Sequence, residues 1–176
     1  MANRLFTPFP VLTTARLTLR QLQRSDAPSI FSLRSNEEIN KYLDRKPSQT
    51  IEDAIHFIQV ITENIQKNDS IYWVISLTES NTFAGTICLF GFSEDHRTCE
   101  IGYELLSDFQ GKGIMKEAAS KVIEYAFQTL EVQTIEAFTH NGNQSSTKLL
   151  EKLGFTKAKE ADHETLDCSI FTLKKP

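Results

Sequence analysis

The chain has 176 residues, the size of one compact domain, so we expect a single domain spanning residues 1–176. A formal net charge of −4, with 40% hydrophobic and 24% charged residues, is ordinary for a globular protein and argues against a nucleic-acid-binding surface. The three cysteines show no CxxC spacing and the four histidines no HExxH spacing, so neither a disulfide framework nor a metal site is expected. The N-terminus lacks the apolar run of a signal peptide and no stretch is long enough to span a membrane, so we expect a cytoplasmic protein.

The first third of the chain predicts one strand followed by two helices. Residues 16–20 alternate polar and apolar side chains, which is the pattern of a half-buried strand. Ser25 or Asp26 can cap the helix that follows. Thr50 opens a second helix that runs toward Lys67. The apolar positions of this second helix keep helical spacing: Ile51, Ala54, Ile55, Ile58 and Ile61.

The middle of the chain predicts three strands, over residues 71–77, 83–92 and 98–106. Short polar turns separate these strands, so antiparallel hairpins are the economical connection. Along the third strand, alternation places every second side chain on the same face of the sheet. One face then carries Glu100, Gly102 and Glu104, and the other carries Ile101, Tyr103 and Leu105, unless a bulge shifts the register.

An amphipathic helix is predicted over residues 114–130, and a further strand over 132–139. Glu117 and Lys121 on the polar face of this helix are spaced for an i,i+4 ion pair. The order strand, helix, strand implies a right-handed crossover, so the two strands that flank the helix should be parallel.

The C-terminal part predicts a short helix over residues 143–153, ended by Gly154, and a last strand over 166–173. Residues 162–164 read as a polar surface turn between them. The whole order of elements is that of a mixed α/β (α+β) sheet in one domain.

The strongest local signal is segment 108–115, Asp-Phe-Gln-Gly-Lys-Gly-Ile-Met, which joins a strand to the amphipathic helix. Gly111 and Gly113 allow positive φ angles and let a ligand approach the backbone closely. The N–H groups of the first helical turn then point outward, at the positive end of the helix dipole, and Lys112 and Lys116 add charge. This combination suits a pyrophosphate, although a tight turn without a ligand is the alternative. The spacing fits neither a Walker loop nor the dinucleotide GxGxxG fingerprint.

The second signal is segment 143–155, NQSSTKLLEKLGF, which by itself describes a capped helix with an apolar face and a glycine stop. Together with EIGYEL at residues 100–105 and QGKGIM at 110–115, it resembles the acyl-CoA signature of the GNAT superfamily. The wording is most similar to the Rim-type branch, which acetylates N-terminal alanine or serine of ribosomal proteins. Relatives of that branch include spermidine and antibiotic acetyltransferases.

The resemblance implies a GNAT fold, a mostly antiparallel sheet of about six to seven strands flanked by about four helices. It also implies an acyltransferase that uses acetyl-CoA as cosubstrate, needs no metal, and acts as a monomer or homodimer. The acceptor would be a primary amine, preferably a protein or peptide N-terminal α-amine. Two alternatives stay open: acetylation of a small amine such as a polyamine or aminoglycoside, and a non-catalytic acyl-CoA-binding domain.

The resemblance assigns roles to individual residues. Leu105 and Leu106 would pair with the pantetheine arm through backbone bonds, as an added strand. Asn143 would bond the pantetheine, and Ser146 would lie near the thioester sulfur. Lys116 would add charge beside the pyrophosphate, which backbone N–H groups would hold; these belong to Gln110, Gly111, Lys112, Gly113, Ile114 and Met115.

The catalytic residues are harder to predict, because many relatives carry a tyrosine acid on the last helix where this chain has Leu149-Leu150. Glu100 is the preferred base, directly or through water, since its neighbour Gly102 leaves space for an amine; Glu104 or bulk water is the alternative. Ser146 is the preferred group near the leaving sulfur. The choice of acceptor should lie in the loops around residues 34–50 and in the last strands, where no motif is diagnostic.

Overall fold

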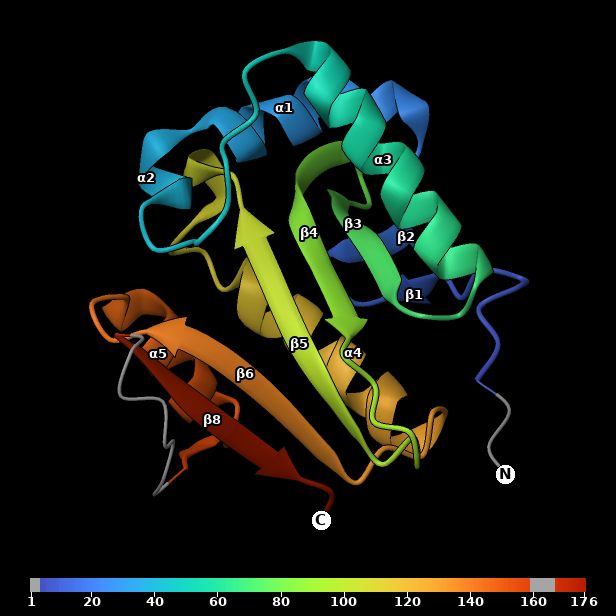
Figure 1. Ribbon diagram of the computed structural model, residues 1–176, viewed down its shortest axis with the longest axis vertical. Helices are drawn as coiled ribbons and strands as arrows, with labels where there is room; N and C mark the ends of the chain where they lie inside the picture. Colours follow the sequence, from blue (N-terminus) through green and yellow to red (C-terminus); the bar gives the residue numbers. More distant parts are fainter. Residues whose placement is uncertain (1–3, 159–166) are drawn as a thin grey trace.

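A sheet of eight strands runs through the computed structural model, which describes residues 4–158 and 167–176 (Figure 1). The spatial order is β1-β2-β3-β4-β5-β6-β8-β7, and every neighbouring pair is antiparallel except the parallel pair β5 and β6. The strands are β1 (Leu12–Thr13), β2 (Leu17–Gln21), β3 (Ile71–Leu77), β4 (Thr82–Phe90), β5 (Thr98–Leu105), β6 (Thr134–His140), β7 (Thr156–Lys157) and β8 (Cys168–Lys174). The helices are α1 (Ala27–Ser35), α2 (Glu37–Asn40), α3 (Ile51–Gln66), α4 (Ile114–Gln128) and α5 (Gln144–Lys152).

All six predicted strands and four predicted helices are present, and the parallel crossover through α4 is confirmed. The elements that the sequence pattern did not predict are β1, β7 and α2, which have two, two and four residues and are too short to show a period. Residue 166 and the polar turn expected at 162–164 lie outside the described residues.

The predicted ion pair between Glu117 and Lys121 is wrong. Lys121 pairs with Glu124, its Nζ lying 2.9 Å from Oε1, while the Glu117 carboxylate turns to Arg16 on the strand side of α4. The Arg16 guanidinium, from an earlier segment of the chain, therefore replaces Lys121 as the partner of Glu117.

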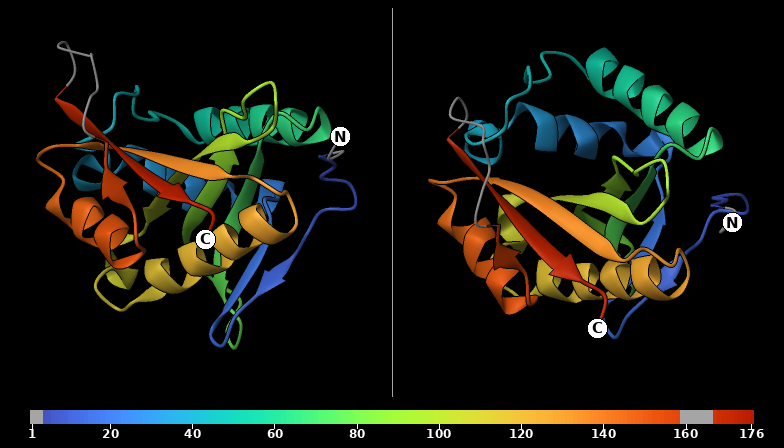
Figure 2. Two further views of the ribbon diagram at one scale, coloured as in Figure 1. Left: turned by 90° about the horizontal axis from the view of Figure 1, so that it is seen from below. Right: turned by 60° about the horizontal axis from the view of Figure 1, so that its bottom comes forward.

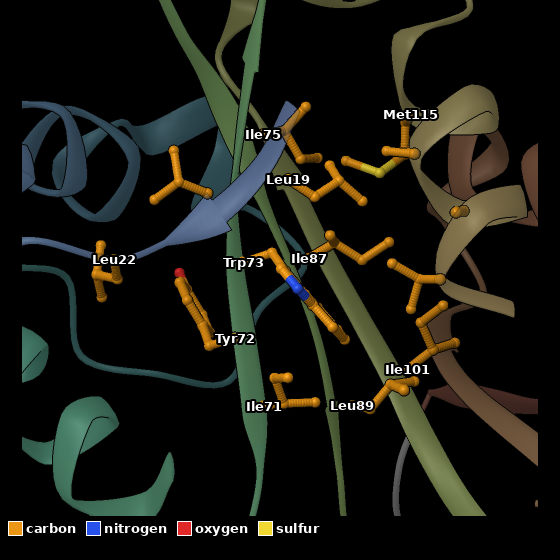
Figure 3. Packing of buried hydrophobic residues seen from close by; sticks show 14 of the residues in the cluster. Leu19, Leu22, Ile71, Tyr72, Trp73, Ile75, Ile87, Leu89, Ile101 and Met115 are labelled. Atoms are coloured by element: carbon orange, nitrogen blue, oxygen red, sulfur yellow. The ribbon is translucent and has the colours of Figure 1, made fainter. Parts of the chain in front are cut away.

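The sheet separates two layers of helices (Figures 1 and 2). α1, α2 and α3 lie on one face of the sheet, and α4 and α5 lie on the other. β3 is buried along six consecutive residues because both of its faces are covered. Figure 3 shows Trp73, Ile87 and Met115 on one side of the sheet and Tyr72 and Leu22 on the other. No helix of the described residues is long and apolar enough to cross a membrane.

β5 and β6 are paired over only a short stretch before they diverge. Their register joins residues 98–100 to residues 134–136, and Glu100 opposite Glu136 is the last pair (Figure 1). On its other edge, β5 stays paired with β4 from Glu100 to Leu105 without a bulge, so the predicted alternation of its side chains is confirmed. The sheet therefore opens into a V whose inner edge is the second half of β5.

Candidate active site

The segment between β5 and α4 has the strained backbone that its glycines predicted. Gly111 and Gly113 both adopt positive φ angles, 72° and 74°, and Gly113 is the N-cap of α4. A Cβ added at Gly111 would meet no atom within 4 Å, so the backbone there faces open space. This exposed, glycine-lined surface fits a group that must touch the backbone directly.

The first turn of α4 offers N–H groups to this surface. The helical ladder begins with the bond from the Glu117 N–H to the Gly113 carbonyl at 3.1 Å. The N–H groups of residues 114–116 come before this bond, so they have no acceptor within the helix. Donors at the positive end of a helix dipole favour an anion, and the residues here suit a pyrophosphate in both shape and charge.

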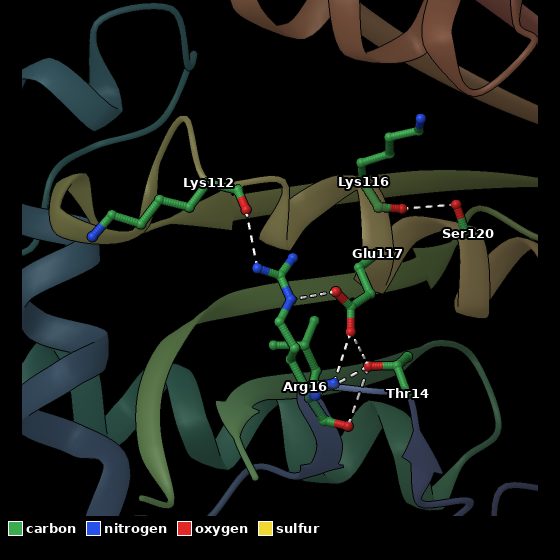
Figure 4. A network of polar contacts seen from close by, with 7 residues as sticks. Thr14, Arg16, Lys112, Lys116, Glu117 and Ser120 are labelled. Atoms are coloured by element: carbon green, nitrogen blue, oxygen red, sulfur yellow. Dashed lines mark hydrogen bonds and ion pairs between the residues drawn. The ribbon is translucent and has the colours of Figure 1, made fainter. Parts of the chain in front are cut away.

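Arg16, one hundred residues earlier in the chain, holds this loop in place (Figure 4). Its Nη1 donates to the Lys112 carbonyl at 3.2 Å, and its Nε lies 2.7 Å from Oε2 of Glu117. Thr14 donates its hydroxyl to the other carboxylate oxygen of Glu117 at 2.6 Å. Arg16 is a site residue that the sequence did not single out, because nothing in the pattern of β2 says which loop it meets.

Partial burial of the Glu117 carboxyl opposes its ionisation. The hydrogen bonds from Thr14 and Arg16 outweigh this and lower the pKa of Glu117. The carboxylate therefore stays charged and keeps the guanidinium beside the loop.

The inner edge of the V is lined by backbone groups of β5. The Leu106 N–H donates to the Ala84 carbonyl at 2.9 Å, which makes Gly85 and Leu105 a non-hydrogen-bonded pair of the ladder. By this phase, the N–H and C=O groups of Ile101, Tyr103 and Leu105 point away from β4, toward the gap. The Leu105 carbonyl accepts the Gln110 side-chain amide at 3.0 Å.

The Leu106 N–H is thus already used within the sheet. An extended ligand in the V would meet the N–H of Leu105, the N–H and C=O of Tyr103 and the C=O of Ile101 instead, because the parallel pairing of Glu100 with Glu136 uses the Ile101 N–H.

Tyr103 crosses from β5 to the start of α5. Its hydroxyl lies 2.8 Å from the hydroxyl of Ser146, and either atom can be the donor. Burial raises the pKa of Tyr103, although the bond to Ser146 works in the opposite direction, so the phenol stays protonated and can donate. The position on α5 where relatives carry a tyrosine holds Leu150, but a tyrosine hydroxyl reaches the same helix from the sheet.

Asn143 caps α5, since its Oδ1 accepts the Ser146 N–H at 3.2 Å. This bond fixes Ser146 at the first turn of the helix, and it leaves the Asn143 amide NH₂ to face other groups. Asn143, Ser146 and Tyr103 therefore meet at the start of α5.

Glu100 lies where β5 and β6 separate. Burial of its carboxyl, and then the nearby negative charge of Glu136, raise the pKa of Glu100. No Lys or Arg of the described residues forms an ion pair with it. Its next neighbour on the same face, Gly102, packs against Cys88 and Phe90, and a Cβ there would lie 3.2 Å and 3.3 Å from them. Glu100 is thus a carboxylate with a raised pKa beside a glycine that the side chains of Cys88 and Phe90 approach closely, which leaves less room there than the sequence predicted.

Glu104, the other carboxylate on this face, has a different environment. It forms an ion pair with Nη1 of Arg45, which comes from the loop between α2 and α3. Its carboxylate is thus already held by a charged partner, whereas Glu100 forms no ion pair with a Lys or Arg of the described residues. Between the two candidates, these contacts favour Glu100 as a base.

Comparison with known proteins agrees with this geometry. The family profile described as "Acetyltransferase (GNAT) domain" matches residues 16–156. The chain belongs to the GNAT acetyltransferase family. It is accordingly an N-acetyltransferase of the GNAT type, with acetyl-CoA as cosubstrate.

Individual GNAT proteins resemble the chain along most of its length. The "Uncharacterized N-acetyltransferase YoaA" of Bacillus subtilis is 37% identical over 149 residues, which cover 85% of this chain and 84% of that protein. The structure of a putative ribosomal-protein-serine acetyltransferase from Vibrio cholerae superposes with a TM-score of 0.82 at 21% identity, covering 96% and 99% of the two chains. Spermidine N-acetyltransferase from Vibrio cholerae, solved with CoA and spermine, superposes with a TM-score of 0.79 at 22% identity, covering 92% and 96%. The two solved structures support the GNAT fold and leave the acceptor open.

The glycine loop gives the first prediction. Replacing Gly113 by Glu puts a carboxylate where the loop and the α4 N-terminus attract an anion. We expect acetyl-CoA affinity to fall by about a hundredfold or more, because like charge and lost backbone access act together. Gly113→Lys, which adds a side chain of similar length and opposite charge, should lose far less affinity. Calorimetry on both variants, after circular dichroism has shown that they fold, measures the difference; near wild-type affinity for Gly113→Glu would contradict the assigned loop.

Proposed function

We propose that the chain moves the acetyl group of acetyl-CoA directly to the α-amine of a peptide or protein N-terminus. The observation that carries the proposal is the position of Glu100, a carboxylate with a raised pKa where β5 leaves β6, beside Gly102. The reaction needs acetyl-CoA, so the proposal places this single-domain enzyme in the cytoplasm.

The acceptor class follows from the proton that must be removed. Only a neutral amine attacks a thioester, and a lysine side chain has an ordinary pKa of about 10.4 while an α-amine has one of about 7.7–8.0. A carboxylate whose pKa is only raised from the ordinary glutamate value is a weak base, so it can deprotonate an α-amine far more readily than a lysine ammonium. The wording of the motifs, closest to the Rim-type branch, supports the same class.

Binding is assigned to three groups of this chain. The N–H groups of residues 110–115 would hold the pyrophosphate, with Lys112, Lys116 and Arg16 adding charge. The free part of the β5 backbone edge, from the Ile101 C=O through Tyr103 to the Leu105 N–H, would pair with the pantetheine amides as an added strand. The Asn143 amide would bond the same arm.

The chemical step exchanges one bond for another. The amine nitrogen attacks the acetyl carbonyl carbon, the C–N bond forms, and the C–S bond breaks. Glu100 accepts one amine proton, directly or through water, and the Ser146 hydroxyl gives a proton to the leaving sulfur. Tyr103 re-protonates Ser146 through their hydrogen bond, and solvent returns the proton from Glu100 to the hydroxyl pair.

The base is tested by two matched carboxamide substitutions. Glu100→Gln keeps the shape and removes the base, so kcat should fall by about a hundredfold while acetyl-CoA affinity changes little. Glu136→Gln removes the neighbouring negative charge and keeps the base. Because that charge helps to raise the pKa of Glu100, its loss should lower this pKa and move the acid limb of the kcat profile to lower pH. Full kcat and an unchanged profile in Glu100→Gln would make Glu100 structural and leave Glu104 or bulk water as the base.

The hydroxyl pair is tested by a double-mutant cycle. Ser146→Ala should lower kcat by about tenfold, a modest loss because a thiol with an ordinary pKa of about 8.5 leaves fairly well. If Tyr103 acts through Ser146, Tyr103→Phe added to Ser146→Ala should cause little further loss, since the relay is already broken. Fully multiplicative losses in the double variant would show that the two hydroxyls act independently.

The acceptor is tested on one peptide that carries both a free α-amine and a lysine. We expect tandem mass spectrometry to find the acetyl group on the α-amine, for the reason of amine pKa given above. Acetylation of lysine alone would contradict the proposal. Spermidine and an aminoglycoside run in parallel test the small-amine alternative, and acetyl-CoA binding without turnover on any amine would indicate a non-catalytic binding domain.

A further inference from the structure

A hollow of about 270 Å³ lies between the end of α1, the start of α3 and the loop that precedes α3. Part of its lining comes from residues 34–50, where the sequence placed the choice of acceptor without a diagnostic motif. Arg34, Lys46, Asp53 and Phe57 are among the residues that line it.

The hollow has cationic groups that no carboxylate of the described residues pairs with. The Arg34 guanidinium lies over the Phe57 ring, 4.0 Å from its centroid, and Lys46 is exposed. The one carboxylate in the lining, Asp53, is already used, because its Oδ2 accepts the N–H groups of Gln49 and Thr50 at 2.7 Å and 3.0 Å. The positive groups are therefore the ones left to face a ligand.

Arg34 also connects the hollow to the face of β5 that carries Glu100 and Gly102. The Phe57 ring beneath its guanidinium packs edge-on against Tyr72, at 5.7 Å between centroids. Tyr72 lies opposite Cys88 in the sheet, and Cys88 lies opposite Gly102. A continuous wall of packed side chains thus runs from the hollow to Gly102, beside which we propose that the amine binds.

A second guanidinium stands on the same wall. Arg45 pairs with Glu104 through Nη1 and donates from Nε to Asn40 at 2.7 Å, while its buried Nη2 has no partner in the described residues. Burial, and then the nearby charge of Arg45, lower the pKa of Arg34. The guanidinium nevertheless stays protonated at neutral pH. Two positive groups held near each other, with one donor unsatisfied, are stabilised by an added anion.

We propose that this hollow binds an acidic side chain of the acceptor, a few residues after the N-terminal amine that is acetylated. The inference rests on the proposed function, because it assumes that a peptide enters along β5. An extended peptide advances about 3.3 Å per residue, so carboxylates at the third, fourth and fifth positions sample successive points along the wall from Gly102 toward Arg34. A polyamine would bring positive charge against Arg34 and Arg45 and is disfavoured.

The experiment compares peptides that differ in one residue. Each has the same N-terminal serine and the same length, and carries Glu, Gln or Lys at position three, four or five. We expect kcat/KM for the best Glu peptide to exceed that of its Gln counterpart by about fivefold or more, and the Lys peptide to be the poorest, since a partly screened charge pair has about this effect. The preference should shrink as salt is added.

Two variants locate the effect. Arg34→Gln combined with Lys46→Gln should remove the preference for Glu, and leave kcat on the Gln peptide close to wild type. Lys67→Gln, the same change at the exposed far end of α3, should keep the preference. Thermal unfolding checks that all variants fold.

The outcomes separate the two proposals. Equal kcat/KM for Glu and Gln peptides at every position, a preference for Lys, or a preference that survives in the double variant would overturn the acidic-acceptor inference while leaving N-terminal acetylation intact. Acetylation of the lysine side chain instead of the serine α-amine, or turnover only with small amines, would overturn the proposed function itself.

Discussion

The site depends on one departure from regular sheet structure, the separation of β5 from β6 after three paired residues. A strand edge that is not paired leaves N–H and C=O groups without partners, which is costly unless water or a ligand satisfies them. Here the unpaired edge runs from the Ile101 C=O through Tyr103 to the Leu105 N–H, and it lies beside the glycine loop that begins α4. The same opening therefore leaves a row of backbone N–H and C=O groups beside the N-terminus of α4, where we propose that the pantetheine arm and the pyrophosphate bind.

Arg16 holds the glycine loop in position beside the opening between β5 and β6. The guanidinium binds a loop carbonyl and the Glu117 carboxylate together, so β2 and the first turn of α4 are joined across the sequence. Since the folded pKa of Glu117 is lowered, this contact stabilises the fold above the ordinary glutamate pKa and is lost as pH falls through the lowered value. An arginine also adds positive charge next to the helix end without needing a phosphate-binding motif of its own.

The sequence predicted what depends on local pattern. The long elements, the parallel crossover and the alternation along β5 all follow from periodicity and turn chemistry, and the glycine loop follows from residue type and its place before a helix. Contacts between distant segments could not be predicted in this way. Arg16 on Glu117, Arg45 on Glu104 and Tyr103 on Ser146 each join residues that no spacing relates.

Two phenylalanines of the sheet lie outside the core, unlike Trp73, which is fully buried. Phe138 is 51% exposed and Phe90 is 38% exposed. Phe90 ends β4 and Phe138 lies in β6, and on the side of the sheet that faces the viewer in Figure 1 no helix of the described residues covers β6 and β8. A strand pattern reports that one face is apolar, but it does not report whether a helix covers that face.

Strand alternation finally explains how one strand can serve both sides of a transfer reaction. Glu100 and Glu104 point to the face of α1–α3, where Arg45 meets Glu104, whereas Tyr103 points to the opposite face and meets Ser146 of α5. The proposed proton acceptor Glu100 and the hydroxyl of Tyr103, the proposed source of the donated proton, thus lie on opposite faces of the same strand, with the unpaired edge between them. In this arrangement the amine approaches from one face and the sulfur leaves toward the other, so the base and the acid need not compete for one proton. A tyrosine on β5 can then replace a tyrosine on α5, because what the chemistry requires is the position of the hydroxyl and not the helix that carries it.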